Sequence, residues 1–329
     1  MRLERTADVT GPVGRAPVAP AGPLLPANRG DRLFAVGLTI FAGIVLLIAG
    51  LIVLMLLRVA HPLSASTSIA KFITGTDWDP VQLSFGALPF IYGTVVTSIV
   101  AIVLAVPVSV GLAVFLVEIA PARVQPIVSF LIETLAAIPS VVYGLWGLFV
   151  LVPLLRSPVE PFLRQVFGFL PLFRGPAIGV GYLAAGLILA IMILPTIASV
   201  TIEVLKTVPP PLREGAYGLG ATRWEAIRMA VLPYARNGIV GAVLLGLGRA
   251  LGETMAVTMV IGNSHEIHAS LFAPGYSLPA IIANEFAEAT GPQYVGALAG
   301  LALVLFGITI VLNAVARLLV HGVGSRASA

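Results

Sequence analysis

The sequence has no cysteine and little charge. Of its 329 residues, 10% are charged and 58% are hydrophobic. The lack of cysteine excludes disulfides, thiolate metal ligands and thiol nucleophiles. Soluble proteins carry about 25% charged residues, so this chain has too little charge to cover a soluble surface of its size. We therefore expect a membrane protein.

Several chemical patterns are also missing. No glycine-rich loop ending in Gly-Lys-Ser or Gly-Lys-Thr occurs, so the chain does not bind ATP by that route. The apolar runs hold no Ser/His, paired-aspartate or metal-ligand constellation, which argues against an intramembrane enzyme. His265 and His268 are three residues apart, but only Glu266 accompanies them. We expect no catalytic residue, metal, cofactor or nucleic-acid partner for this chain.

Six apolar runs are long enough to cross a membrane core about 30 Å thick, which takes roughly 20 helical residues. The predicted fold is therefore all-α and polytopic, with six transmembrane helices. A flexible tail, rich in proline, alanine and glycine, is expected over 1–32, and a short tail over 321–329. The transmembrane domain between them covers 33–320, with spans at about 33–57, 88–118, 124–152, 178–200, 237–262 and 294–319.

The distribution of arginine and lysine predicts the orientation. Thirteen of the 19 basic residues lie in the tails and in the loops on the side of the N-terminus, five lie in the opposite loops, and Arg249 lies inside the fifth span. Positive residues accumulate in cytoplasmic loops. We therefore expect both termini, and the large loop over 203–236, to be cytoplasmic, and the loops over 58–87, 153–177 and 263–293 to lie outside.

The cytoplasmic loop 203–236 predicts two short helices around a glycine turn. Pro209–Pro211 stop one element and can begin a helix, and Gly218-Leu219-Gly220 permit a sharp reversal. A second, amphipathic helix is expected over Thr222–Leu232, ended by Pro233. Such a knob could seat in a groove of another protein, or it could lie on the lipid headgroups; the residues alone leave these interpretations about even.

Two charges lie inside the fifth span. Arg249 and Glu253 are four residues apart, which on one helix puts them on one face. Charges near the bilayer centre cost at least about 2.5 kcal/mol each and rarely face lipid. Either the two residues form a structural pair, aided by Glu133 of the third span, or Arg249 presents its guanidinium to a passing oxyanion while Glu253 holds it and moderates its affinity. These roles are compatible, and we favour the second.

The loop resembles the "EAA" loop of ABC importer permeases, whose pattern is Glu-Ala-Ala, then Gly, then Ile-x-Leu-Pro. It departs from the pattern at Gly215, where the family has alanine, and in the longer spacing between Ile227 and Leu232. In that family the loop is the coupling helix that docks onto the nucleotide-binding subunit. The resemblance implies this role here for Glu214, Gly215, Ala216, Gly220, Leu232 and Pro233.

Three further segments resemble phosphate ABC transporter permeases. They are Gly248–Val257, with the sequence GRALGETMAV, Ile138–Gly144, and Ala283–Glu288. The first and last are similar to the PstC-type subunit rather than its PstA-type partner. The resemblance implies a type I ABC importer permease fold and a part for Arg249 and Glu253 in phosphate translocation.

The resemblance also implies the partners. The chain is expected in the inner (plasma) membrane, among lipid, paired with a second homologous permease and two ATP-binding subunits that hold ATP and magnesium. An extracytoplasmic phosphate-binding protein would deliver the substrate, and alternating access would pass it inward. A sulfate or molybdate permease would share the coupling loop. An ion-coupled secondary transporter or channel would not need it, and inverted repeats, a mark of many secondary transporters, are not evident.

Overall fold

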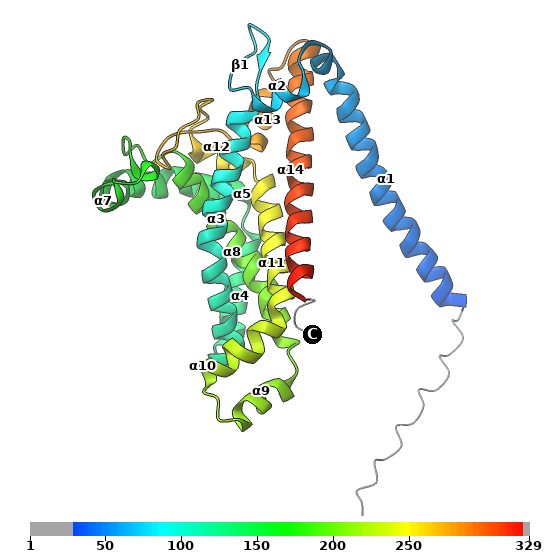
Figure 1. Cartoon of the computed structure of the whole chain (residues 1–329), viewed down its shortest axis with the longest axis vertical. Helices are drawn as coiled ribbons and strands as arrows, with labels where there is room; N and C mark the ends of the chain where they lie inside the picture. Colours follow the sequence, from blue (N-terminus) through cyan, green and yellow to red (C-terminus); the bar gives the residue numbers. More distant parts are fainter. Residues whose placement is uncertain (1–28, 325–329) are drawn as a thin grey trace, which may run out of the picture. The chain divides into compact units, whose positions relative to one another are not determined.

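The computed structural model describes residues 29–324, as two units. The first unit, up to Ile52, contains the N-terminal part of helix α1 (Arg29–Ser66). The second unit begins at Val53 and holds every other element (Figure 1). Of the two predicted tails, 29–32 and 321–324 are helical, and the remainder lies outside the described residues.

The predicted class, an all-α polytopic protein, is confirmed. Within residues 29–324, six helical runs are long and apolar enough to cross a membrane, and the only strands there form one small hairpin. The six runs are Arg32–Leu63, Leu88–Ile119, Ser140–Phe167, Tyr182–Lys206, Arg223–Gly252 and Pro292–Val315.

Several runs join more than one helical segment, because turns of π-helix interrupt the α-helical pattern. The second run joins α3 (Leu88–Val114) and η1 (Phe115–Ile119), and the fifth joins α10 (Arg223–Ala226), η5 (Ile227–Val231) and α11 (Leu232–Gly252). The third consists of α5 (Ser140–Trp146), η2 (Gly147–Leu151), α6 (Val152–Leu154), η3 (Leu155–Val159) and α7 (Glu160–Phe167).

The fourth run is α8 (Tyr182–Lys206), and the sixth lies in α14 (Pro292–Gly324). Shorter elements connect the runs: α2 (Ile69–Thr74), β1 (Trp78–Asp79), β2 (Ser84–Phe85), α4 (Gln125–Ala137), the 3-10 turn η4 (Pro171–Phe173), α9 (Pro210–Gly218), α12 (Met255–Ile261) and α13 (Leu278–Glu285). β1 and β2 pair antiparallel, with Trp78 opposite Phe85.

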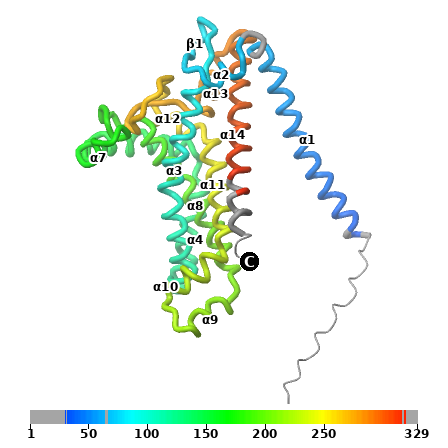
Figure 2. The backbone as a smooth tube through the Cα atoms, in the orientation of Figure 1, coloured from blue at the N-terminus to red at the C-terminus, as the bar shows by residue number. Residues whose placement is uncertain are grey.

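Helix α8 is the centre of the second unit. It runs beside α3 and α11, and α14 runs beside α11 (Figures 1 and 2). Ile188, Ile193 and Ile197 are fully buried along it. Two glycines allow close helix approach: a Cβ at Gly144 would lie 2.6 Å from Met259 Sδ of α12, and one at Gly147 would lie 2.8 Å from Ile188 Cδ1. The third run therefore packs closely against α8 and α12.

The predicted third span, 124–152, is wrong in its boundaries. The chain is extended at Ile138 and Pro139, which separate α4 from the helical run that starts at Ser140. The proline ring disfavours the helical conformation for the residue before it, so the break falls there. The run then continues to Phe167: Pro153 lies in α6 directly after the π-helical turn η2, and Pro158 lies within the π-helical turn η3. The predicted outer loop over 153–177 is correspondingly shorter.

The predicted fifth span, 237–262, and the helix before it also differ from the structure. Pro233 does not end the helix over Thr222–Leu232; it lies in α11 directly after the π-helical turn η5, and the run continues from Arg223 to Gly252. The run ends earlier than predicted. Glu253 has an extended backbone, with φ −72° and ψ 126°, and α12 is a separate helix.

The second unit has two ends, which we name by their elements. The loop end contains α9 and α10, and the hairpin end contains β1, β2 and α13 (Figure 2). At the hairpin end, Glu285 joins three separate segments. Its Oε2 accepts hydrogen bonds from Trp78 Nε1 at 2.8 Å and Tyr294 Oη at 2.7 Å, and its Oε1 lies 3.4 Å from His265 Nε2. One carboxylate thus ties the hairpin, α14 and the 262–277 segment together.

These contacts determine how Glu285 titrates. Burial raises its pKa, but the hydrogen bonds from His265, Tyr294 and Trp78 outweigh burial and hold the pKa below the usual value. A carboxylate with a depressed folded-state pKa contributes stability above its unfolded pKa and loses it as the pH falls through the folded pKa. The stability that Glu285 contributes to the hairpin end is therefore complete at a pH above the ordinary pKa of a glutamate. It is lost as the pH falls below that value.

We predict that Glu285→Gln destabilises the hairpin end by about 2 kcal/mol at neutral pH, because its donors lose a charged acceptor. The measurement is the fluorescence of Trp78, in a chain whose Trp146 and Trp224 are replaced by Phe. In the native chain, acidification should break the contact between Trp78 and Glu285 and change the fluorescence of Trp78. In the variant, this fluorescence should depend much less on pH. An equal acid response in both chains would contradict the assignment to Glu285.

Candidate functional site

Arg249 lies in the last turn of α11, inside the fifth run and half-buried. Its Nη1 donates a hydrogen bond of 3.3 Å to Thr196 Oγ1, near the middle of α8. Arg249 thus joins the fifth run to the fourth, and it lies at a helix C-terminus, where the exposed carbonyl dipoles stabilise a cation.

Glu253 does not share a helical face with Arg249, so that part of the prediction is wrong. Because α11 ends at Gly252, the carboxylate of Glu253 turns toward the next helix, where its Oε1 accepts a hydrogen bond of 3.2 Å from the backbone N–H of Ala256. Glu253 therefore stabilises the first turn of α12 and the helix break before it.

Glu133 is also separate from Arg249. It is exposed on α4, which lies before the Pro139 break. In the part of the chain that the structure describes, no ion pair involves Arg249; the pairs there are Lys206–Glu203, Arg213–Glu118, His265–Glu285 and His268–Glu266. The structural pair weighed as an alternative role is therefore not formed. A guanidinium has five N–H donors, and its contact to Thr196 uses only one of them.

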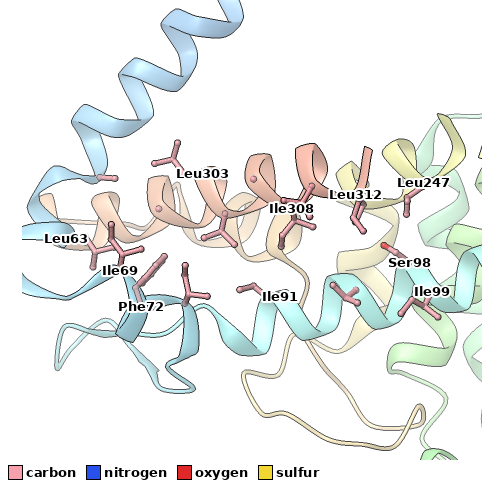
Figure 3. Close-up of a pocket in the computed structure, with 18 of the residues that line it drawn as sticks. Leu63, Ile69, Phe72, Ile91, Ser98, Ile99, Leu247, Leu303, Ile308 and Leu312 are labelled. Carbon is pink, nitrogen blue, oxygen red and sulfur yellow. The ribbon is translucent and has the colours of Figure 1, made fainter. Parts of the chain in front are cut away.

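An apolar cavity of the second unit is not suited to an anion. It measures about 980 Å³ and is lined by apolar side chains of the end of α1, α2, α3, α11 and α14, with Ser98 and Thr67 as its polar residues. Figure 3 shows Ile308 and Leu312 of α14 facing α3 across it. On α11 the lining residues are Leu247 and Leu251, which at 3.6 residues per turn lie roughly 160° from Arg249. The cavity and the cation are on opposite faces.

The glycine turn predicted at the loop end is present. α9 begins at Pro210, and Gly220 has φ +85°, a left-handed conformation that favours glycine. Thr222 then begins α10 with a capping box, in which its hydroxyl accepts from Glu225 N and the Glu225 carboxylate accepts from Thr222 N. Local hydrogen bonds therefore define the start of α10 directly after the glycine turn.

The predicted docking residues fall into two groups. Glu214, Gly215 and Gly220 are exposed on α9 and its turn, beside the half-buried Ala216. Large apolar side chains are exposed around them: Tyr217, Leu219 and Trp224. Leu232 and Pro233, in contrast, belong to the first turn of α11, where Leu232 is half-buried and packs on the core.

Sequence reasoning missed one residue of this region, Glu118 of η1. It is buried and forms an ion pair of 2.7 Å with Arg213 of α9. An acidic residue at the end of an apolar run was a visible signal, but its partner is 95 positions away. No group of three or more His, Asp or Glu that could hold a metal occurs within residues 29–324.

Known proteins resemble the chain over most of its length. A relative in Mesorhizobium japonicum, named phosphate transport system permease protein PstC, is 47% identical over 320 residues, which are 93% of this chain and 98% of the relative. A protein of the same name in Pasteurella multocida is 51% identical over 78% of this chain and 81% of its own. A protein of Mycobacterium tuberculosis named phosphate transport system permease protein PstC 2 is 40% identical, over 95% of this chain and 98% of its own length.

Solved structures share the fold. Two chains of the MetNI methionine ABC transporter match with TM-scores of 0.54 and 0.50, at 18% and 20% identity. The two matches cover 75% and 72% of this chain, and 99% and 94% of the respective transporter chains. The predicted permease fold is therefore confirmed. Residues 105–325 match the family described as binding-protein-dependent transport system inner membrane component. The chain belongs to that family.

Proposed function

We propose that the chain is the permease subunit of an ATP-driven importer that passes inorganic phosphate into the cytoplasm. Arg249 carries this proposal: it is a guanidinium inside an apolar run, with no carboxylate partner among the described residues. A guanidinium matches phosphate oxygens in charge and geometry. The names of the relatives, which specify phosphate transport, support the same substrate.

The surroundings of Arg249 suit passage rather than tight storage. Thr196 orients the guanidinium and leaves its other donors free for an anion. The carbonyl groups at the end of α11 partly compensate the charge, which limits the affinity so that a bound anion can leave. Glu253 acts by capping α12, since its carboxylate is held at Ala256 N, and so fixes the break that places Arg249 at a helix end.

The loop end is proposed to be cytoplasmic and to dock onto an ATP-binding subunit. Two observations support this: basic residues accumulate there, as in cytoplasmic loops, and Tyr217 of α9 and Leu219 just after it are exposed near Glu214. The full assembly contains a second homologous permease, two ATP-binding subunits with ATP and magnesium, and a phosphate-binding protein outside. Both termini face the cytoplasm. ATP-driven closure would move the docked loop and switch access between the two sides.

We predict that Arg249→Gln lowers phosphate uptake by about 30-fold, because loss of a charge-assisted contact costs about 2 kcal/mol. Arg249→Lys should retain part of the uptake, since it keeps the charge but not the planar fork. The measurement is uptake of radiolabelled phosphate by cells lacking their own system. Arg156→Gln, an exposed arginine of the third run, is the control. Normal uptake by Arg249→Gln would refute the pathway role.

We predict that the Gly220→Val variant no longer co-purifies with the ATP-binding subunit. A β-branched residue at φ +85° costs about 1–2 kcal/mol of backbone strain. A change of backbone conformation that relieves this strain would move α9 relative to α10. Gly291, with φ +84° at the hairpin end, provides a matched control. Gly291→Val should be destabilised to a similar extent but should still co-purify with the ATP-binding subunit. Equal co-purification of both variants with full transport would refute docking through this turn.

A further inference from the structure

Helix α9 is attached to the rest of the chain in an unusual way. None of its residues is buried, and its apolar side chains Leu212 and Tyr217 are 39% and 45% exposed. Apolar burial, which normally fixes a short amphipathic helix on a protein, is therefore small here. The attachment of α9 must come from polar contacts and from the chain connections at its two ends.

One side chain supplies most of the polar contacts. Arg213 of α9 binds the carboxylate of Glu118 in η1. Its Nη2 donates to Oε1 at 2.7 Å, and its Nε donates to Oε1 at 3.1 Å and to Oε2 at 3.3 Å. The same guanidinium donates from Nη1 to the carbonyl of Val208 at 2.6 Å and from Nη2 to that of Leu205 at 3.1 Å. These carbonyls lie at and just beyond the end of α8, where the last turn leaves acceptors without helical partners.

Glu118 binds residues on both sides of the glycine turn, Arg213 of α9 and Arg223 of α10. Its side chain is 6% exposed, so the ion pair is shielded from water on the carboxylate side. Its backbone carbonyl accepts a hydrogen bond from Arg223 Nη2, at the start of α10. The segments on both sides of the glycine turn are therefore bound to one residue at the end of the second run.

This ion pair differs from an ordinary surface pair. The pair Lys206–Glu203 at the same end of the second unit has side chains 56% and 72% exposed, and such pairs contribute little. Arg213–Glu118 is largely buried, has several hydrogen bonds, and would leave an unpaired buried charge if one partner were removed. Its geometry is consequently fixed, and a displacement of α9 must move Glu118 or break the pair.

We propose that Glu118 and Arg213 are positioning residues that transmit movement of α9 to the second run, α3 with η1. This inference rests on the proposed docking of α9 onto an ATP-binding subunit. Because α3 packs along α8, which holds Thr196 against Arg249, a push at α9 reaches the substrate site through packed helices. The ion pair therefore sets the number of phosphates transported per ATP hydrolysed. Docking onto the ATP-binding subunit depends instead on the exposed face of α9.

The test is the number of phosphates transported per ATP hydrolysed by the purified complete transporter in liposomes. Glu118→Gln keeps the shape of the side chain and removes its charge, and Arg213→Lys keeps the charge and removes the bidentate geometry. Each should lower this ratio about tenfold, with co-purification of the ATP-binding subunit and ATP hydrolysis retained. Because the two residues act as one unit, the double variant should be no worse than the more affected single variant.

Lys206→Gln is the matched control and should leave the ratio unchanged. A normal ratio in both Glu118→Gln and Arg213→Lys, while the native complex transports phosphate, would overturn the inference and leave the proposed function intact. Additive losses in the double variant would also overturn it. If Glu118→Gln does not reach the membrane, Arg213→Lys alone decides. Failure of the native complex to transport phosphate would instead refute the proposed function.

Discussion

The free energy of placing a charge in an apolar medium is the constraint on which this structure depends. The chain has few charges, and those inside its helical runs require compensation by a partner, a helix end or a substrate. Glu118 has Arg213, whereas Arg249 has one hydroxyl and the end of α11. This difference separates a structural ion pair at the loop end from a cation that has no carboxylate partner among the described residues.

Breaks in the helices determine where these charges lie. The run that contains Arg249 ends at Gly252, so the guanidinium lies at a helix terminus and Glu253 is directed to α12. The break at Pro139 separates α4, with its exposed Glu133, from the third run. Both breaks lie in segments that resemble phosphate permeases in sequence. Arg249 is left without a carboxylate partner among the described residues, because Glu253 is bound to α12 and Glu133 is exposed on α4.

Uninterrupted apolar length made some elements predictable. The spans at 88–118 and 294–319 nearly coincide with the second run and with most of α14. Proline was harder to interpret, since its effect depends on the turn in which it falls: Pro139 breaks a helix, while Pro233 begins α11 without a break. Arg249 could be singled out as a charge in an apolar run. The pairing of Glu118 with Arg213 could not, because it depends on how α9 folds back onto the second run, and no local pattern encodes that contact.

The proposed function is the passage of phosphate through a site built on a guanidinium that has no carboxylate partner among the described residues. Its most direct measurement is ATP-dependent accumulation of radiolabelled phosphate in liposomes that contain the complete transporter and its binding protein, with excess unlabelled sulfate as competitor. We expect accumulation that requires ATP and is unaffected by sulfate. Accumulation without ATP, or competition by sulfate as effective as that by unlabelled phosphate, would contradict the account.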